Sequence, residues 1–93
     1  MAQATISQLR ALIRSLKYVV TTHAADELED DNLTILDLEN NILTGKVVER
    51  QRDAKSREIK YVVDGIAIDG AAAQAVVKVG FSGKLVVVTA YLG

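Results

Sequence analysis

The sequence contains no cysteine, no proline and no tryptophan, and it has only one histidine. Without cysteine the chain can form neither a disulfide framework nor a thiolate metal site, and one histidine cannot supply a zinc ligand set. No apolar stretch approaches the roughly eighteen residues of a membrane span, and no apolar run of a signal peptide follows the first basic residues. A glycine-rich phosphate loop is also missing. We therefore expect no metal, no cofactor, no membrane association and a cytoplasmic location.

The remaining chain is short and rich in hydrophobic residues, which make up 49% of its 93 positions. This length supports one core, so we expect a single domain over residues 1–93. The formal net charge of -1 gives no global attraction to nucleic acid. The charge is nevertheless divided along the chain. Residues 22–45 contain seven acids and no lysine or arginine, whereas residues 46–60 contain six cations and three acids.

The first half of the sequence has the apolar periodicity of helices. Residues such as Ile6, Leu9 and Ile13 recur on one helical face, and Thr34 and Gly45 are suited to begin and end a further helix. The pattern predicts helices over residues 5–17, 23–30 and 34–44.

From residue 46 onward the apolar period changes to two, which is typical of strands. Asp69-Gly70 and Ser82-Gly83 are turn signals between them, and Gly65 indicates either a bulge or a shortened strand. The segment from Tyr18 to Thr21 is a short strand or an extended link. The predicted strands cover residues 46–51, 58–68, 72–79 and 85–91.

Together these elements predict an α+β fold in which the N-terminal helices pack on one face of a small four-stranded antiparallel meander sheet. The positions that face both the helices and the sheet should form the core. The predicted core residues are Leu9, Ile13, Leu28, Leu38, Ile42, Val63, Val77 and Val87.

Several short strings in this order resemble a family of short bacterial domains of unknown function, of the DUF4258 type. The strings are Thr22-His23-Ala24, Lys46-Val47-Val48-Glu49, Lys60-Tyr61-Val62-Val63-Asp64-Gly65 and Val86-Val87-Val88-Thr89-Ala90-Tyr91, with a helix that ends at Gly45. The resemblance extends over residues 18–92. That family in turn resembles the RelE/ParE superfamily of toxin–antitoxin toxins, which implies a RelE/ParE-like fold and a partner antitoxin.

One departure from the family pattern affects the expected function. After the His-Ala pair the family commonly has an Arg-Met pair and a further arginine, whereas this chain has Glu27-Leu28 and Asp31. Two cations are thus replaced by two anions, which disfavours phosphate contact by this helix.

Two residues are candidates for proton transfer. His23 could act as a general acid or base in RNA cleavage through attack by the 2′-hydroxyl. The resemblance implies a similar place for Tyr91, because mRNA-cleaving toxins of the superfamily often carry an active-site residue near the end of the last strand. Structural roles are the alternative: His23 as a backbone partner at a helix start, and Tyr91 as a packing residue.

The basic segment around residues 50–60 is the candidate RNA-binding element. A cationic hairpin can neutralise phosphates, but hairpin tips are also charged simply because they are solvated. The candidate RNA-binding residues are Arg50, Arg52, Lys55, Arg57 and Lys60.

Two functions follow from these observations. The first is the toxin-like component of a type II toxin–antitoxin system, an mRNA-cleaving ribonuclease held by an antitoxin and acting on RNA or the ribosome. The second is a non-catalytic protein-binding module or decayed toxin. We also expect a homodimer in isolation, formed through an unpaired edge of the C-terminal strand.

Overall fold

The computed structural model describes residues 4–93, which form three helices and five strands. Every predicted helix and strand is present with boundaries shifted by a few residues, and the segment after the first helix forms an additional strand. The elements are α1 (Ile6–Arg14), β1 (Tyr18–Val20), α2 (Thr22–Asp30), α3 (Ile35–Thr44), β2 (Lys46–Arg52), β3 (Ile59–Ile66), β4 (Ala72–Val79) and β5 (Leu85–Leu92).

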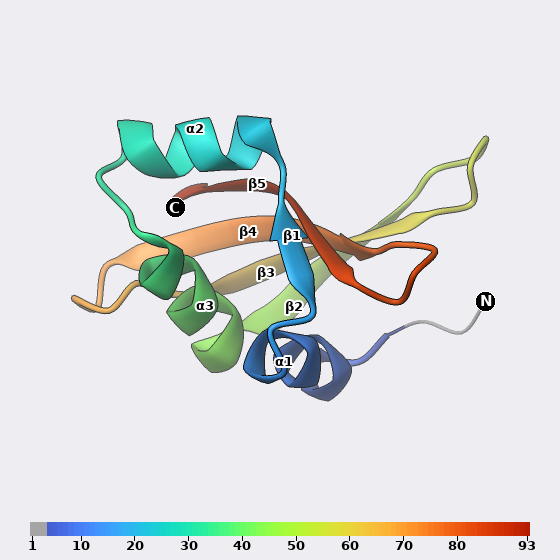
Figure 1. The fold of residues 1–93 in the computed structure, drawn as a ribbon, viewed down its shortest axis with the longest axis horizontal. Coiled ribbons are helices and arrows are strands. Elements are labelled where there is room, and N and C mark those ends of the chain that lie inside the picture. Colours follow the sequence, from blue (N-terminus) through green and yellow to red (C-terminus); the bar gives the residue numbers. More distant parts are fainter. Residues whose placement is uncertain (1–3) are drawn as a thin grey trace.

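The strands form one mixed sheet in the order β1-β5-β4-β3-β2 (Figure 1). Strands β2 to β5 are an antiparallel meander, as expected, but β1 pairs in parallel with the first residues of β5, Leu85 to Val87. The sheet is therefore five-stranded and mixed, and the expectation of a purely antiparallel four-stranded sheet is wrong. A segment as short as Tyr18–Val20 can be either a strand or an extended link. It becomes a strand here because β5, far away in the sequence, pairs with it.

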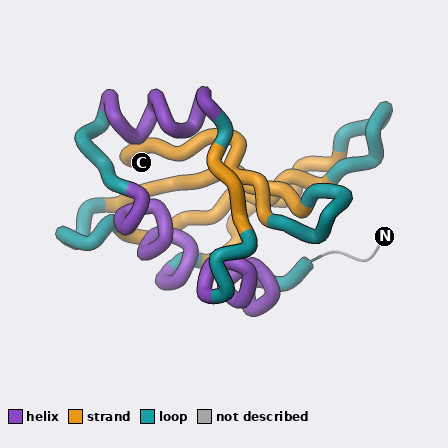
Figure 2. Tube along the Cα trace, in the orientation of Figure 1, coloured by secondary structure: helices purple, strands orange, loops and turns teal. Residues whose placement is uncertain are grey.

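The helices cover the sheet unequally. Helix α3 packs on β3 and β4, α1 packs against α3 and β5, and α2 runs along β5, as Figure 1 shows. All eight predicted core residues are buried, with exposed fractions of 5% or less. The loops of the β2–β3 and β4–β5 hairpins project on one side of the molecule, and the β3–β4 turn lies on the other (Figure 2).

Gly65 lies where α3 approaches the sheet most closely. A Cβ atom at this position would stand 2.0 Å from the backbone oxygen of Asn41 in α3. Gly65 pairs regularly with Ala73, and the sheet bulges lie elsewhere, in β2 and between β4 and β5. The sequence suggested a bulge or a shortened strand at this glycine, and both expectations are wrong. Gly65 instead makes room for helix α3.

The start of α3 is held by a reciprocal pair of hydrogen bonds. The Thr34 hydroxyl accepts from the Asp37 amide, and the Asp37 carboxylate accepts from the Thr34 amide at 2.8 Å. The same carboxylate accepts from the Ile68 amide at 3.0 Å, which ties α3 to the β3–β4 turn. These backbone donors, that of Thr34 first, lower the pKa of Asp37 below its ordinary value of 3.8.

We expect the Asp37→Asn substitution to flatten the acid dependence of stability. The pKa of Asp37 is lower in the folded chain than in the unfolded chain, so the ionised carboxylate stabilises the fold at pH values above 3.8, the ordinary pKa. This stabilisation is lost as the pH falls through the lower pKa of the folded chain. Thermal melts between about pH 5 and about pH 2 should show a steeper fall for the unsubstituted chain. Asp30→Asn, at an exposed acid of α2, should keep the steep fall, and equal slopes for all three chains would contradict this role.

Candidate functional site

The β2–β3 hairpin presents cations whose neighbouring acids are already engaged. In the loop, the Asp53 carboxylate accepts hydrogen bonds from the amides of Lys55 at 2.8 Å and Ser56 at 3.1 Å. These donors, Ser56 first, lower the pKa of Asp53. Glu58 forms an ion pair with Lys78 at 2.7 Å. Within residues 4–93, none of the five predicted RNA-binding side chains forms an ion pair, so the hairpin keeps a surplus of positive charge.

The strand register distributes these cations over both faces of the sheet. Arg50 stands opposite Tyr61, which is buried on the helix side, and its guanidinium lies 6.0 Å from the centre of the Tyr61 ring. Arg52 stands opposite Ile59 and therefore belongs to the same face. Lys60 is paired with Lys78 on the other face, which no helix covers. The five candidate RNA-binding residues are thus not one patch on one surface.

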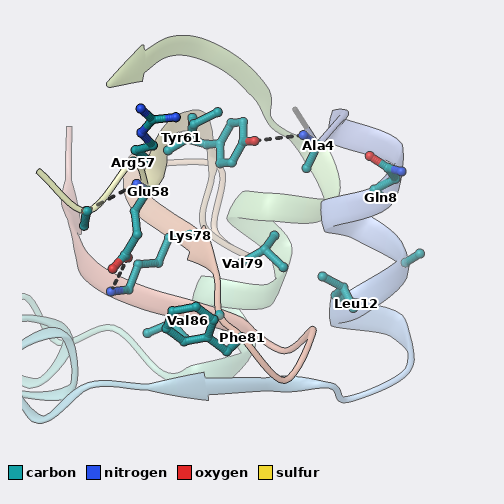
Figure 3. Close-up of a pocket in the computed structure, with 14 residues that line it drawn as sticks. Ala4, Gln8, Leu12, Arg57, Glu58, Tyr61, Lys78, Val79, Phe81 and Val86 are labelled. Atoms are coloured by element: carbon teal, nitrogen blue, oxygen red, sulfur yellow. Dashed lines mark hydrogen bonds and ion pairs between the residues drawn. The ribbon is translucent and has the colours of Figure 1, made fainter. Parts of the chain in front are cut away.

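An apolar groove lies on the helix side, between α1 and the ends of β3, β4 and β5. Its volume is about 830 Å³. Figure 3 shows Gln8 and Leu12 of α1 on one side and Val79 and Tyr61 toward the sheet. The Tyr61 hydroxyl accepts a hydrogen bond of 2.8 Å from the Ala4 amide, so the chain that enters α1 closes this end of the groove.

The rim of the groove combines one exposed aromatic ring with charged side chains. Phe81, in the β4–β5 turn, has an exposed fraction of 103%. Arg57 and the Glu58–Lys78 ion pair line the rim across from α1 (Figure 3). The sequence did not lead us to expect this groove. The available signal was the single phenylalanine of the chain, placed beside the Ser82-Gly83 turn where solvated residues are usual.

His23 lies in the first turn of α2 with 72% of its side chain exposed. Its Nε2 atom is 3.4 Å from a carboxylate oxygen of Glu27. The same oxygen accepts hydrogen bonds from the Thr89 hydroxyl and the Ala90 amide. The threonine hydroxyl thus donates to the carboxylate and not to the imidazole, so this trio lacks the geometry of a histidine-activated nucleophile.

Two acids of the α2 region, Glu27 and Asp31, hold the edge of β5. Glu27 accepts from the Ala90 amide at 3.2 Å, and Asp31 accepts from the Leu92 amide at 2.9 Å. They satisfy backbone donors beyond the short stretch that β1 covers. β1 and these two acids thus occupy part of the β5 edge, and the outer edge of the sheet on the other side is β2. The homodimer through β5 stays a prediction.

Tyr91 lies on the helix-free face, at the opposite end of the sheet from the hairpin. Its hydroxyl is hydrogen-bonded to the Gln74 side chain, which donates in turn to the Asp64 carboxylate at 2.5 Å. Gln74 and Val79, the last residue of β4, are five residues apart, or about 16 Å along the strand. The structure thus places Tyr91 beside an acid and away from the cations of the hairpin loop.

The other two tyrosines have packing roles. Tyr61 is buried in the core, and the Tyr18 hydroxyl donates to the Glu39 carboxylate. Burial, together with the hydrogen bond and charge of Glu39, raises the pKa of Tyr18 to about 12.

The described part of the chain contains no group of three or more side chains placed to hold a metal ion. Among the helices of residues 4–93, none has the length and apolar character required to span a bilayer.

A family model described as "Domain of unknown function (DUF4258)" matches residues 20–92. The matched segment begins in β1 and reaches the end of β5, so it contains α2, α3 and the whole meander but not α1. The chain therefore belongs to this family. No curated protein and no solved structure gives a significant match.

Proposed function

We propose that this domain is the toxin-like component of a bacterial type II toxin–antitoxin system and that it contacts RNA through the β2–β3 hairpin. The observation that carries this proposal is the hairpin itself, whose five cations have no ion-pair partner within residues 4–93 while its acids are engaged. Such cations neutralise RNA phosphates. The role implies a cytoplasmic location, where mRNA and ribosomes are found, and a partner antitoxin.

The RelE/ParE resemblance supports the same proposal. Helices on a small sheet dominated by an antiparallel meander agree with the RelE/ParE-like fold that we propose for the family. The fifth, parallel strand is a feature of this chain that the resemblance did not imply.

The proposed chemistry is metal-independent cleavage of RNA. A base removes the proton of a ribose 2′-hydroxyl, the 2′-oxygen attacks the adjacent phosphorus, and the bond to the 5′-oxygen breaks. An acid protonates that oxygen, which leaves a 2′,3′-cyclic phosphate and a 5′-hydroxyl. His23 and Tyr91 are the proposed proton-transfer residues. The Glu27 carboxylate lies near both residues: it is 3.4 Å from His23 and accepts a hydrogen bond from the amide of Ala90, the residue before Tyr91.

We expect the Arg52→Gln and Lys55→Gln substitutions to weaken the binding of single-stranded RNA. Each lost phosphate contact should lower the slope of log affinity against log salt by about one unit, while base preference stays unchanged. Fluorescence anisotropy with a labelled single-stranded RNA over a salt series measures both quantities.

Lys17→Gln is the matched control, because Lys17 is an exposed cation between α1 and β1 and lies outside the hairpin. The control should bind like the unsubstituted chain. Equal loss in all three variants would indicate unspecific attraction, and no RNA affinity at low salt would remove the proposal.

The second candidate function is a non-catalytic protein-binding module. The apolar groove and the exposed Phe81 favour it, and so does the distance between Tyr91 and the hairpin loop. Induced expression in a bacterial host separates the two. Growth arrest supports the toxin-like role, whereas normal growth together with absent RNA cleavage by the purified chain supports the module.

A further inference from the structure

We infer that the groove between α1 and the sheet binds an apolar segment of a partner protein whose flanking residues are acidic. The inference does not depend on any cleavage activity. Its surface shares Arg50, Arg52 and Arg57 with the proposed RNA contact, whereas Lys55 and Lys60 belong to the RNA contact alone. The inference rests on three properties of the groove: its apolar interior, the exposed ring at its rim, and the sign of the charges around it.

The interior of the groove needs an apolar occupant. Leu12, Ile59 and Val79 are only partly buried, although they pack against the core. A volume of about 830 Å³ is large enough for several side chains. Covering this surface removes apolar area from water, which is the main favourable contribution to association.

Phe81 has the features of an anchor residue. Its ring is fully exposed, with an exposed fraction of 103%, and it stands on a turn whose backbone is fixed by the Gly83-to-Gly80 hydrogen bond of 3.0 Å. In the described part of the chain, no other large hydrophobic side chain is as exposed. Aromatic residues at a rigid position beside a groove are typical hot spots of protein interfaces.

The charge at the rim selects an acidic partner. Arg50, Arg52 and Arg57 stand on or beside the groove without an ion-pair partner in residues 4–93. The only acid in the lining, Glu58, is neutralised by Lys78. Guanidinium groups bind carboxylates in paired hydrogen bonds, so aspartate or glutamate next to the apolar residues of the segment would complete the contact.

A second copy of this chain fits the groove less well. Four of the seven acids in its residues 22–45 are already hydrogen-bonded within the chain: Glu27, Asp31, Asp37 and Glu39. The other three, Asp26, Glu29 and Asp30, lie on α2, whose apolar residues Ala24 and Leu28 are buried and cannot enter a groove. An anionic membrane also fits less well, because a concave groove cannot be filled by a flat bilayer surface. The occupant is therefore a segment of another protein.

The test uses the full chain and a displayed library of random peptides. Selection against the unsubstituted chain, with prior depletion on the Ala11→Glu variant, should enrich peptides that combine apolar residues with aspartate or glutamate. Ala11 lines the groove and is exposed on α1, so a glutamate there places a repelling carboxylate in the groove without disturbing the core. Ala11→Gln, which has the same length and no charge, should retain more of the binding.

A synthetic peptide from the selection then serves for quantitative measurements. We expect Phe81→Ala to weaken its binding about tenfold or more and Arg57→Gln to weaken it several-fold with a smaller salt dependence. Ile68→Ala is the control, because Ile68 is an exposed apolar residue of the opposite turn, with an exposed fraction of 61%. The Ile68→Ala variant should bind the peptide as tightly as the unsubstituted chain does.

Several outcomes would overturn the inference. One is enrichment of basic or uncharged peptides, and another is the failure of any peptide to distinguish the chain from Ala11→Glu. Self-association in sedimentation that Phe81→Ala abolishes would assign the groove to a second copy. Binding to vesicles containing anionic lipid, without peptide binding, would assign it to a membrane. By contrast, RNA binding that is lost in Lys55→Gln while peptide binding remains would support the inference, because the groove then binds the peptide independently of the RNA contact at Lys55.

Discussion

Replacing Gly65 with alanine is expected to destabilise the fold by about 3 kcal/mol or more. The added Cβ would lie 2.0 Å from the Asn41 backbone oxygen, and a backbone atom cannot move aside as the end of a side chain can. Helix α3 would have to lift from β3, which would disturb Leu38 and Ile42 in the core. The temperature of half-unfolding should fall by more than about 10 °C in a domain of this size.

Gly80→Ala is the matched control for this experiment. The nearest atom to a Cβ at Gly80 is a methyl carbon of Val86 at 3.5 Å, which is ordinary contact. Its melting temperature should remain close to that of the unsubstituted chain. If Gly65→Ala melted at the same temperature as this control, the close approach of α3 to β3 would be wrong.

If the domain cleaves RNA through the proposed residues, His23→Ala and Tyr91→Phe should each lower the cleavage rate about 100-fold or more. RNA affinity should change little, because proton transfer contributes to the transition state and not to phosphate binding. Single-turnover cleavage of a labelled single-stranded RNA, measured beside anisotropy of the same RNA, separates rate from affinity.

Tyr18→Phe controls for the loss of a tyrosine hydroxyl, because that hydroxyl is held by Glu39 and belongs to β1. It should cleave at the unsubstituted rate. Growth arrest that survives the loss of both His23 and Tyr91 would refute the site assignment and leave the toxin-like role standing. Under the binding-module alternative, His23→Ala should instead lower the melting temperature slightly, since the residue contacts Glu27 near β5.

The separation between Tyr91 and the hairpin loop has a direct consequence for these experiments. The two lie about 16 Å apart along the sheet. Lys60 and Lys78 are on the helix-free face together with Tyr91. An RNA that reaches both ends would have to run along this face, so oligonucleotides too short to do so should bind the hairpin without being cleaved.

Glu27 and Asp31 show why the site could not be interpreted from residue types alone. From the sequence, the two anions appear only to repel phosphate. In the structure they accept hydrogen bonds from Ala90 and Leu92, more than sixty positions away. The two acids have a structural function at the edge of β5, and no local pattern in α2 reveals it.

The sequence by itself determined the type and order of the elements and the composition of the core. These properties depend on short-range effects: the apolar period of about 3.6 or two residues, the capping box at Thr34, and the Asp69-Gly70 turn, whose glycine has a φ of +89°. The tertiary structure alone decided the parallel pairing of β1, the distribution of the hairpin cations over two faces, and the groove beside Phe81. Each of these depends on contacts between residues far apart in the chain, such as Ala4 with Tyr61, for which the local sequence carries no signal.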